Sequence, residues 1–359
     1  MKNDLGLSGR WLMMTSRDDV RVGRERAERL RRKLLALGVL DRSLKPAQQG
    51  EHVIFPLKCV DENVKRIVME EGAELIRYDF EVREIRPRSL EEILGDEIPS
   101  SLLQKLPSSY DLIGDLILIE IPDELKSHAK KIGEALMRMH PRVRSVLAKG
   151  ETIGEYRVRR IEVIAGSPNT ETVHREHGCV YKLDLRKAFF NPRFSGERIR
   201  VARSVKPGEK ILDMFAGVGP FSILIAKTQP SSELTAIELN PDAYKYLVEN
   251  IRLNRVEDRV KPVLGDAREI LKDVSEEFDR VIMDLPHSSI NFLDIGLRVC
   301  RKGGLLNFYG AASSLGELSQ KVLKRVGELG YDVRIEFGRE ILEVAPRKRI
   351  FALEIRKSS

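Results

Sequence analysis

The sequence predicts an α/β protein whose C-terminal part is a Rossmann-like domain with a mostly parallel sheet, preceded by two smaller α+β domains. Residues 205–359 alternate apolar, strand-like runs with amphipathic, helix-like runs, which is typical of a parallel sheet with right-handed crossovers. A glycine turn separates the first of these strands from its helix. At 359 residues the chain is too long for one comfortable core, so two or three domains are expected.

Composition indicates an ordinary globular protein. The chain is 42% hydrophobic and 33% charged, and it has no apolar run of the roughly eighteen residues that span a bilayer. The N-terminal residues lack the pattern of a signal peptide, so a cytoplasmic location and no membrane partner are expected. The net charge of +7 permits a polyanionic partner without requiring one. Three separated cysteines, Cys59, Cys179 and Cys300, form neither a zinc pattern nor a disulfide framework.

Residues 1–98 predict a small α/β domain with a basic helix over about 20–38. The segment 20–33, VRVGRERAERLRRK, carries seven Arg or Lys residues against two Glu. Such a helix suits phosphate groups, and the alternative is a solvated amphipathic helix that packs on its leucines. Short Pro- and Ser-rich patches make 99–109 a predicted linker.

A middle α+β domain is predicted over 110–204. It begins with the strand-like DLIGDLILIEIP and continues with the amphipathic helix ELKSHAKKIGEALMRMH. Several β-rich segments follow, including YRVRRIEVIAG, ETVHREHGCVYKLDL and KAFFNPRF. The regular strand–helix alternation then starts at about 205.

The first strand of the C-terminal domain leads into a turn that suits a phosphate- or nucleoside-bearing ligand. Residues 210–227, KILDMFAGVGPFSILIAK, predict a buried strand, a glycine turn and a helix. Gly217 and Gly219 let the backbone approach a ligand closely, and the helix N-terminus beyond them favours negative charge. Asp213 ends the strand just before the glycines. A tight turn without a ligand is the alternative role for the glycines.

The next three strands also deliver polar residues to the carboxyl edge of the sheet, where open α/β sheets bind ligands. Glu238 ends the second strand, where a carboxylate can accept hydrogen bonds from both ribose hydroxyls. Asp266, after the third strand, is placed to read an adenine amino group, or alternatively to cap a helix. The fourth strand ends in the sequence DLP. The candidate cofactor-binding residues are Asp213, Phe215, Gly217, Gly219, Glu238, Leu239, Asp266, Ala267, Asp284 and Pro286.

Two cofactors compete for this site. NAD is possible because Gly217, Gly219 and Ser222 loosely approach the dinucleotide fingerprint. S-adenosylmethionine is favoured because an acid before the glycine turn can hold its amino-acid end. The C-terminal segment also predicts a closing β-hairpin, which is how methyltransferase sheets finish. No metal is expected, since the spacing of the histidines matches no ligand set.

The chain resembles the archaeal and eukaryotic tRNA (guanine-N1)-methyltransferases, which modify the guanosine 3′ of the anticodon at position 37 of tRNA. The likeness covers roughly 110–359 and rests on RVRRIEVIAG, TETVHREHGCVYKLDLRKAFFNPRFSGERIRVA, DMFAGVGPF, AIELNPDAYKYLVENIRLN, GDARE and DLPHSS. FFNPRFSGER just ahead of DMFAGVGPF is specific to this group and its wyosine-pathway relatives. The first hundred residues look like the family's small N-terminal domain, which reaches the tRNA elbow.

The resemblance implies a class I methyltransferase domain with a mostly parallel, seven-stranded sheet and S-adenosylmethionine as methyl donor. It further implies that tRNA binds through its anticodon loop and its elbow, and we expect a monomer. Three catalytic positions follow from the matching motifs. Glu197, in SGER, matches the acid assigned as general base, and Arg157, in GEYRVRR, matches the arginine that holds guanine O6, with Arg159 and Arg160 nearby. Asp284 falls where the family usually has asparagine. The candidate substrate-binding residues are Phe189, Asn191, Arg193 and Pro286.

These residue types suit the chemistry that the resemblance implies. Guanine N1 carries a proton, so its methylation needs a base, and negative charge then develops on O6, where a guanidinium stabilises it. Asp284 can accept hydrogen bonds from N1–H and the N2 amino group, so either Asp284 or Glu197 can take the proton. The alternatives are a helix-start Glu197 that pairs with Arg198 or Arg200, and an Asp284 that only caps a turn.

Three functions are weighed. The first is tRNA (guanine-37-N1) methylation, with a wyosine precursor as a possible second substrate. The second is aminocarboxypropyl transfer in the wyosine pathway, and the acid-Leu-Pro element after the fourth strand favours methyl transfer over it. The third is a non-catalytic tRNA-binding protein, which would be expected to have lost Asp213, Glu238 or the glycines.

Overall fold

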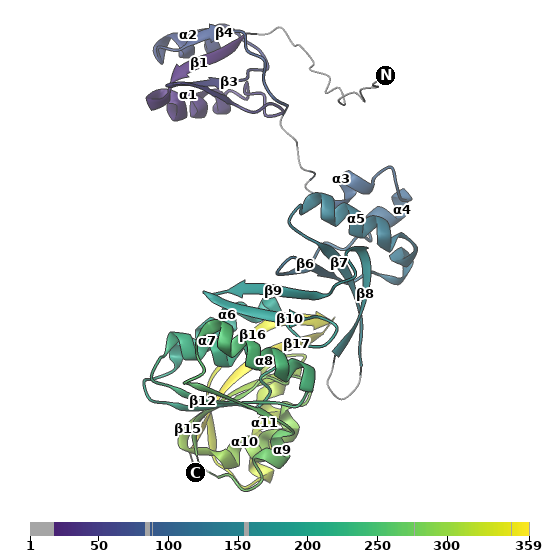
Figure 1. The fold of residues 1–359 in the computed structure, drawn as a ribbon, viewed down its shortest axis with the longest axis vertical. Helices are drawn as coiled ribbons and strands as arrows, with labels where there is room; N and C mark the ends of the chain where they lie inside the picture. Colours follow the sequence, from purple (N-terminus) through teal and green to yellow (C-terminus); the bar gives the residue numbers. More distant parts are fainter. Residues whose placement is uncertain are drawn as a thin grey trace, which may run out of the picture. The chain divides into compact units, whose positions relative to one another are not determined.

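A computed structural model describes residues 18–82, 87, 89–153, 158–275, 277–345 and 347–358 (Figure 1). The chain divides into two compact units between residues 86 and 87. The division into domains at 98, 110 and 205 stays a prediction. The segment predicted as a linker contains a short helix, and its Leu106 is buried in a core with Leu90, Leu94 and Ile132.

The first unit is a small α/β layer. Its sheet has the order β2-β3-β1-β4, and α1 and α2 pack on it. The predicted basic helix begins later than expected, because residues 19–23 form a strand. Val20 and Val22 alternate with polar residues and are both buried, so this segment pairs with β3 and β4. The elements are β1 (Asp19–Gly23), α1 (Arg24–Ala36), β2 (Ala47–Gln49), β3 (His52–Phe55), α2 (Glu62–Glu70) and β4 (Glu74–Ile76).

The cations of α1 are largely engaged within the unit. Arg29 and Lys33 contact Glu71 at 2.6 and 2.8 Å, and Arg31 and Arg32 contact Glu28 at 2.7 and 3.1 Å. The same arginine and lysine side chains remain between 39% and 78% exposed. These are the contacts of a solvated helix, which was the alternative interpretation of this segment.

The second unit begins with a four-stranded sheet of order β5-β6-β7-β8, covered by α5. The run predicted as one strand from 110 is a hairpin that turns at Gly114, where φ is +60°. The elements are α3 (Leu90–Leu94), α4 (Ser100–Leu103), β5 (Tyr110–Ile113), β6 (Leu116–Ile119), η1 (Asp123–His128), α5 (Ala129–Met139), β7 (Ser145–Ile153) and β8 (Val158–Gly166).

A separate hairpin and a loop connect this sheet to the C-terminal one. The hairpin pairs β9 (Glu171–Glu176) with β10 (Cys179–Asp184). The segment KAFFNPRF, predicted as β-rich, is instead a loop that ends in η2 (Pro192–Phe194) and α6 (Ser195–Ser204). Asn191 starts η2, because its side-chain oxygen accepts a hydrogen bond from the Arg193 N–H at 3.0 Å.

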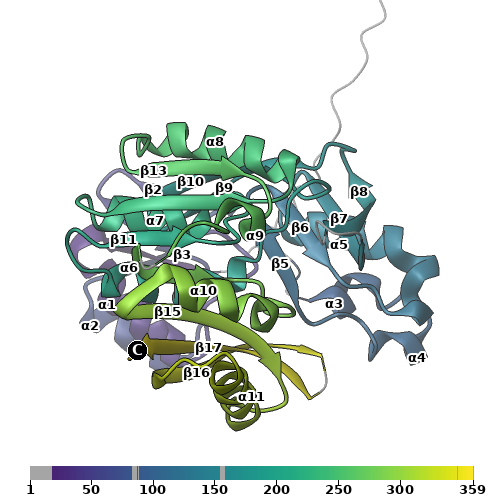
Figure 2. The ribbon, with the colours of Figure 1, turned by 90° about the horizontal axis from the view of Figure 1, so that it is seen from below.

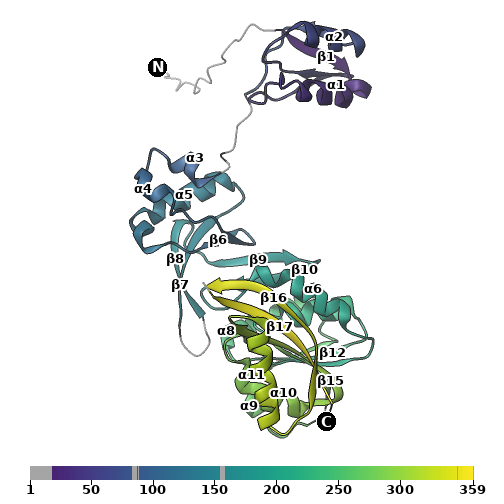
Figure 3. The same ribbon diagram turned by 180° about the vertical axis from the view of Figure 1, so that it is seen from behind.

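The C-terminal sheet confirms the predicted Rossmann-like fold. Its seven strands have the order β13-β12-β11-β14-β15-β17-β16, and only β17 runs antiparallel to its neighbours. Helices α6, α7 and α8 cover one face, and α9, α10 and α11 cover the other (Figures 1 and 3). The strands are β11 (Lys210–Asp213), β12 (Glu233–Glu238), β13 (Val260–Leu264), β14 (Phe278–Met283), β15 (Cys300–Ala312), β16 (Val333–Ala345) and β17 (Lys348–Lys357). The helices are α7 (Pro220–Thr228), α8 (Pro241–Asn254), α9 (Ala267–Ile270), α10 (Leu293–Val299) and α11 (Leu315–Glu328), with η3 (Ser289–Phe292) before α10.

The last two strands form the predicted closing hairpin. β16 and β17 are paired antiparallel along most of their length, and β17 inserts between β16 and β15 (Figure 2). Within the parts of the chain that the structure describes, no helix is both long and apolar enough to cross a membrane.

Candidate functional site

Three carboxylates meet at the carboxyl edge of the sheet. β11 is paired in parallel with both β12 and β14, so Asp213, Glu238 and Asp284 follow or end adjacent strands. Side chains alternate along a strand, so Asp284 shares the face of Ile282, which packs with the α6–α8 layer. The same layer holds Glu197, whose charge acts on Asp284 together with that of Asp213.

The turn after β11 contains two glycines in left-handed conformations, which allow a ligand to approach the backbone closely. Gly217 has φ of +55°, and its N–H donates to Glu238 Oε2 at 2.7 Å. The other oxygen of Glu238 accepts from the Asn240 N–H at 2.7 Å. Gly219 has φ of +89°, and a Cβ there would lie 2.7 Å from Leu247 Cδ1 and 2.8 Å from Ile223 Cδ1. Glycine is required at Gly219 both by conformation and by packing.

Asp213 is buried, and only one of its two carboxylate oxygens has a hydrogen-bond partner among the described residues. It is 1% exposed, and its Oδ2 accepts a hydrogen bond from Ser222 Oγ at 2.7 Å. Its Oδ1 has no hydrogen-bond partner among the residues the structure describes. Burial, assisted by the charge of Glu238, raises the pKa of Asp213 to about 6. A buried carboxylate oxygen with a free acceptor position fits the cationic amino group of S-adenosylmethionine.

The remaining predicted cofactor contacts surround this edge. Asp266 caps α9, since its carboxylate accepts from the Arg268 N–H at 2.7 Å, which was the alternative role for this residue. The Phe215 ring meets the Phe292 ring edge-on at 4.9 Å. Leu239, just past β12, is 37% exposed, whereas Ala267 is buried. An exposed apolar side chain beside the Glu238 carboxylate suits the face of an adenosine.

The acid-Leu-Pro element forms a turn in which Asp284 is not the cap. Ser289 takes that role: its Oγ accepts from the Leu285 N–H at 3.1 Å and donates to the Met283 carbonyl at 2.8 Å. Pro286 has no N–H to offer, and its carbonyl accepts from the Ala311 N–H of β15 at 2.9 Å. Asp284 itself is partly exposed. Burial by the surrounding protein, with the charges of Asp213 and Glu197, raises the pKa of Asp284 to about 7.

Glu197 is buried and fully engaged. It is 1% exposed, and Arg200 donates two hydrogen bonds to its carboxylate, from Nη2 to Oε1 at 2.8 Å and from Nε to Oε2 at 2.9 Å. Tyr309 donates to Oε1 at 3.0 Å, and Arg339 Nε lies 3.5 Å from Oε2. The pairing of Glu197 with Arg200, weighed from the sequence as an alternative, is therefore present.

Arg200 also connects Glu197 to a buried polar chain. Its Nη1 lies 2.6 Å from Glu354, which accepts from Asn307 at 3.3 Å. Asn307 in turn accepts from Arg280 at 2.9 Å, and Arg280 pairs with Glu209 at 2.8 Å. The Arg200 charge is thus shared between two carboxylates.

The loop before α6 carries the candidate substrate contacts. Phe189 is 48% exposed, and the guanidinium carbon of Arg159 lies 4.8 Å from the centre of its ring. Burial lowers the pKa of Arg159. Arg193 Nε bonds Asp111 at 2.6 Å. Arg157 lies outside the described residues. Arg159, in β8, is the arginine that the structure places beside a predicted substrate residue, Phe189.

Arg198 is buried and hydrogen-bonds the backbone of the loop before α6. Its guanidinium makes two bonds to Glu176, at 2.8 and 2.6 Å, and a third to the Asn191 carbonyl at 3.1 Å. Burial opposes ionisation of Glu176, but the bonds from Arg198 and His174 outweigh it and lower the pKa of Glu176 to about 2. The Arg198 charge is therefore already balanced.

Two asparagines of α8 act as a neighbouring strand for β10. Asn254 exchanges two bonds with the Val180 backbone, at 2.9 and 2.6 Å, and Asn250 exchanges two with Lys182, at 2.7 and 2.9 Å. Asn250 also donates to the Val218 carbonyl, inside the glycine turn, at 3.0 Å. These two amides tie the hairpin that precedes the substrate loop to the turn at the cofactor edge. The two asparagines belong to the motif AIELNPDAYKYLVENIRLN, but their role depends on tertiary contacts.

We expect Asn250→Leu to destabilise the protein by about 1–3 kcal/mol, because the substitution leaves the part-buried Lys182 backbone groups and the buried Val218 carbonyl without this partner. Thermal or urea unfolding measures this change. Asn291→Leu, at an exposed position in η3 where the side chain makes no hydrogen bond to another described residue, is the control and should change stability by less than about 0.5 kcal/mol. Equal effects of the two substitutions would contradict the proposed bridging role.

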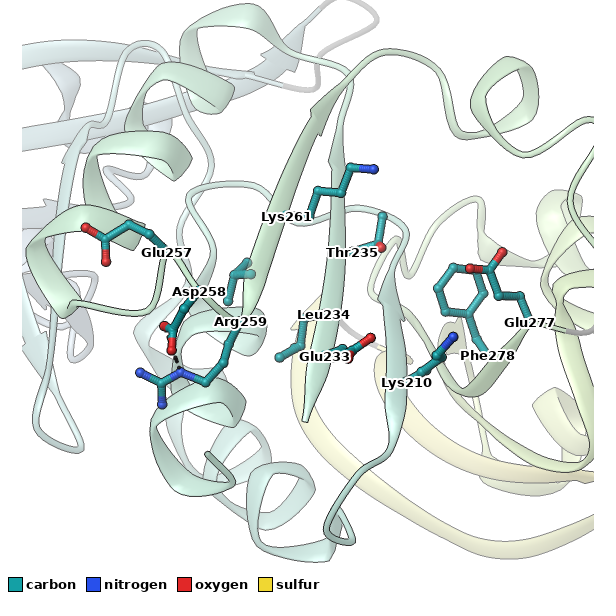
Figure 4. Close-up of a pocket in the computed structure, with 11 residues that line it drawn as sticks. Lys210, Glu233, Leu234, Thr235, Glu257, Asp258, Arg259, Lys261, Glu277 and Phe278 are labelled. Carbon is teal, nitrogen blue, oxygen red and sulfur yellow. Dashed lines mark hydrogen bonds and ion pairs between the residues drawn. The ribbon is translucent and has the colours of Figure 1, made fainter. Parts of the chain in front are cut away.

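The opposite edge of the sheet has a hollow of about 230 Å³ at the strand starts (Figure 4). Its charges are mixed, and Arg259 is already bound to Asp258 at 3.1 Å. Parallel sheets bind ligands at their carboxyl edge, so this hollow is not the candidate site. Across the described ranges, no group of three or more His, Cys, Asp or Glu residues could hold a metal ion.

Comparison with known proteins gives three family matches. The TRM5/TYW2 methyltransferase domain matches residues 172–336, the TYW2 N-terminal domain 90–170, and the tRNA methyltransferase 5 N-terminal domain 20–67.

Individual relatives agree with these matches. The tRNA (guanine(37)-N(1))-methyltransferase Trm5b of Pyrococcus abyssi is 40% identical, over 94% of this chain and 98% of its own length. The tRNA(Phe) (4-demethylwyosine(37)-C(7)) aminocarboxypropyltransferase of Pyrococcus horikoshii is 36% identical, over 69% of this chain and 88% of its own. The solved complex of aTrm5 and tRNALeu superposes with a TM-score of 0.77 at 32% identity, covering 94% of this chain and 99% of that one.

Proposed function

We propose that this chain, which belongs to the TRM5/TYW2 family and is an S-adenosylmethionine-dependent tRNA methyltransferase, methylates N1 of the guanosine 3′ of the anticodon. The observation that carries this proposal is the pair of carboxylates, Glu197 and Asp284, beside the Asp213 edge of the sheet. A base and a methyl-donor site are the two parts that N1 methylation needs.

Each part of the site is assigned a role in this proposal. Asp213 holds the amino group of the donor, and Glu238 with the glycine turn holds its ribose. S-adenosylmethionine supplies a methyl group on a positively charged sulfur, which keeps the electron pair of the broken carbon–sulfur bond. Either Glu197 or Asp284 accepts the proton from guanine N1, and the N1 electron pair forms the new bond to the methyl carbon.

The substrate side uses the loop before α6. Phe189 offers an exposed ring on which a splayed base can stack, and Asn191 and Arg193 belong to the same loop. Arg157 is assigned to guanine O6 through its motif, and Arg159, whose guanidinium lies over the Phe189 ring, adds a second positive charge beside the predicted substrate loop. The tRNA elbow is assigned to the first unit, whose residues 20–67 match the tRNA methyltransferase 5 N-terminal domain.

The test is a methyl-transfer assay on unmodified tRNA transcripts, followed by nucleoside mass spectrometry. N1-methylguanosine at position 37 is expected, and it should be lost when this guanosine is replaced by adenosine in the transcript. Asp213→Ala should abolish binding of S-adenosylmethionine, measured by calorimetry, while Asp258→Ala at the opposite edge should leave it unchanged.

Aminocarboxypropyl transfer is the second candidate, because the Pyrococcus horikoshii relative is 36% identical to this chain. That relative matches 69% of this chain, whereas the Trm5b relative matches 94% at higher identity, which favours methyl transfer. A 4-demethylwyosine-containing tRNA serves as the second substrate in the same assay. An aminocarboxypropyl product, without N1-methylguanosine on the unmodified transcript, would reverse the order of the two candidates.

A further inference from the structure

We infer that Asp284, rather than Glu197, accepts the proton from guanine N1, and that Glu197 positions the surrounding residues. This inference rests on the proposed function and names its catalytic base. It depends on how the two carboxylates are bonded, how exposed they are, and which cations are available to each.

The carboxylate oxygens of Glu197 already accept hydrogen bonds from neighbouring side chains. Both of its oxygens are held by Arg200, at 2.8 and 2.9 Å, and Oε1 also accepts from Tyr309 at 3.0 Å. Oε1 therefore has both of its lone pairs occupied, and Oε2 is shared between Arg200 and Arg339, at 2.9 and 3.5 Å, so neither oxygen is free to accept a bond from a substrate N–H. Protonation of Glu197 would also leave Arg200 with Glu354 as its one remaining carboxylate partner among the described residues.

Asp284 is the opposite case. No group in the described part of the chain hydrogen-bonds its carboxylate, because Ser289 caps the turn instead. The groups that act on it are Asp213 on β11, Glu197 and Arg198 on α6, and Tyr309 on β15. Two of these are acids, and the one cation, Arg198, is bound to Glu176 at 2.6 and 2.8 Å. Asp284 therefore has lone pairs available and lacks a cation of its own.

Exposure favours the same assignment. The Glu197 side chain is 0% exposed, whereas Asp284 is partly exposed at the end of β14. A base must lose the proton again before the next turnover, and a carboxyl group in contact with solvent can do so directly. The raised pKa of Asp284, about 7, also lies where a general base works best near neutral pH.

The test compares Asp284→Asn with Glu197→Gln in single-turnover methyl transfer across pH 5–9, with equilibrium binding of tRNA and S-adenosylmethionine measured for each variant. The wild-type rate constant should rise with pH and then level off. Asp284→Asn should lower it at least about 100-fold and remove the rise, while binding changes less than about threefold. Glu197→Gln should keep the rise, whatever its effect on the plateau.

A readout independent of the reaction is the titration of Asp284 in the donor-free protein. With 13C-labelled aspartate, two carboxyl signals, those of Asp213 and Asp284, should titrate above the ordinary aspartate range, and the one with the higher pKa should disappear in Asp284→Asn. Methyl transfer by Asp284→Asn within tenfold of wild type, with the rise intact, would overturn the inference but not the proposed function. If the rate constant of Glu197→Gln no longer rose with pH, Glu197 would be the residue that accepts the proton. Wild-type protein that forms no N1-methylguanosine would overturn both.

Discussion

Glu197→Ala is expected to lower the free energy of unfolding by about 3–5 kcal/mol, because it removes the buried carboxylate of the ion pair with Arg200. Arg200 would lose two bonds and keep only Glu354, and the buried Tyr309 hydroxyl would lose its acceptor. Chemical denaturation of the donor-free protein measures this loss. An activity assay of Glu197→Ala alone cannot assign a catalytic role, since a partly unfolded enzyme would also be inactive.

The control for this prediction is a comparable pair in a less buried place. Glu249 lies 3.0 Å from Lys182, and their side chains are 44% and 29% exposed. Glu249→Ala should change the free energy of unfolding by less than about 1 kcal/mol, since exposed ion pairs contribute little. If the two alanine variants were equally stable, Glu197 would not be the anchor of the polar chain that includes Arg200 and Arg280.

The parts of the fold that the sequence predicts well are those with a regular pattern. The alternation after residue 205 identified a mostly parallel sheet and its closing hairpin, because each buried strand is a short apolar run between polar turns. The errors fall on short segments. The helix predicted over about 20–38 includes residues 20–23, which belong to β1, since a five-residue strand beside a strongly helical run carries little signal of its own.

The site divides in the same way. Asp213, Glu238 and Asp284 could be placed at one edge because strand ends follow from strand order. The partners of Glu197 could not be predicted beyond Arg200, since Tyr309 and Arg339 lie more than a hundred residues away and reach it only through the sheet. The same holds for Asn250 and Asn254, whose amides resemble ordinary surface side chains of a helix until β10 is placed beside them.

Asp284→Asn is expected to stabilise the donor-free protein at pH 8 by about 2–4 kcal/mol relative to wild type. The pKa of Asp284 is raised from 3.8 in the unfolded chain to about 7 in the fold, and each pKa unit corresponds to about 1.4 kcal/mol. The stability that the protonated form contributes is fully present below pH of about 4 and is lost as the pH rises through about 7. Asparagine stays neutral throughout and avoids this loss.

Urea unfolding of both proteins at several pH values between 4 and 8 measures the effect. The two free energies should coincide near pH 4, where Asp284 is protonated and similar in shape to asparagine, and should separate as the pH rises. Asp258→Asn, an exposed position beside Arg259, should run parallel to wild type. A difference that is constant with pH, or an asparagine variant that is the less stable protein at pH 8, would mean that another group balances the Asp284 charge. Asp284 would then be a substrate-reading residue held ionised, and the proton from guanine N1 would need a different acceptor.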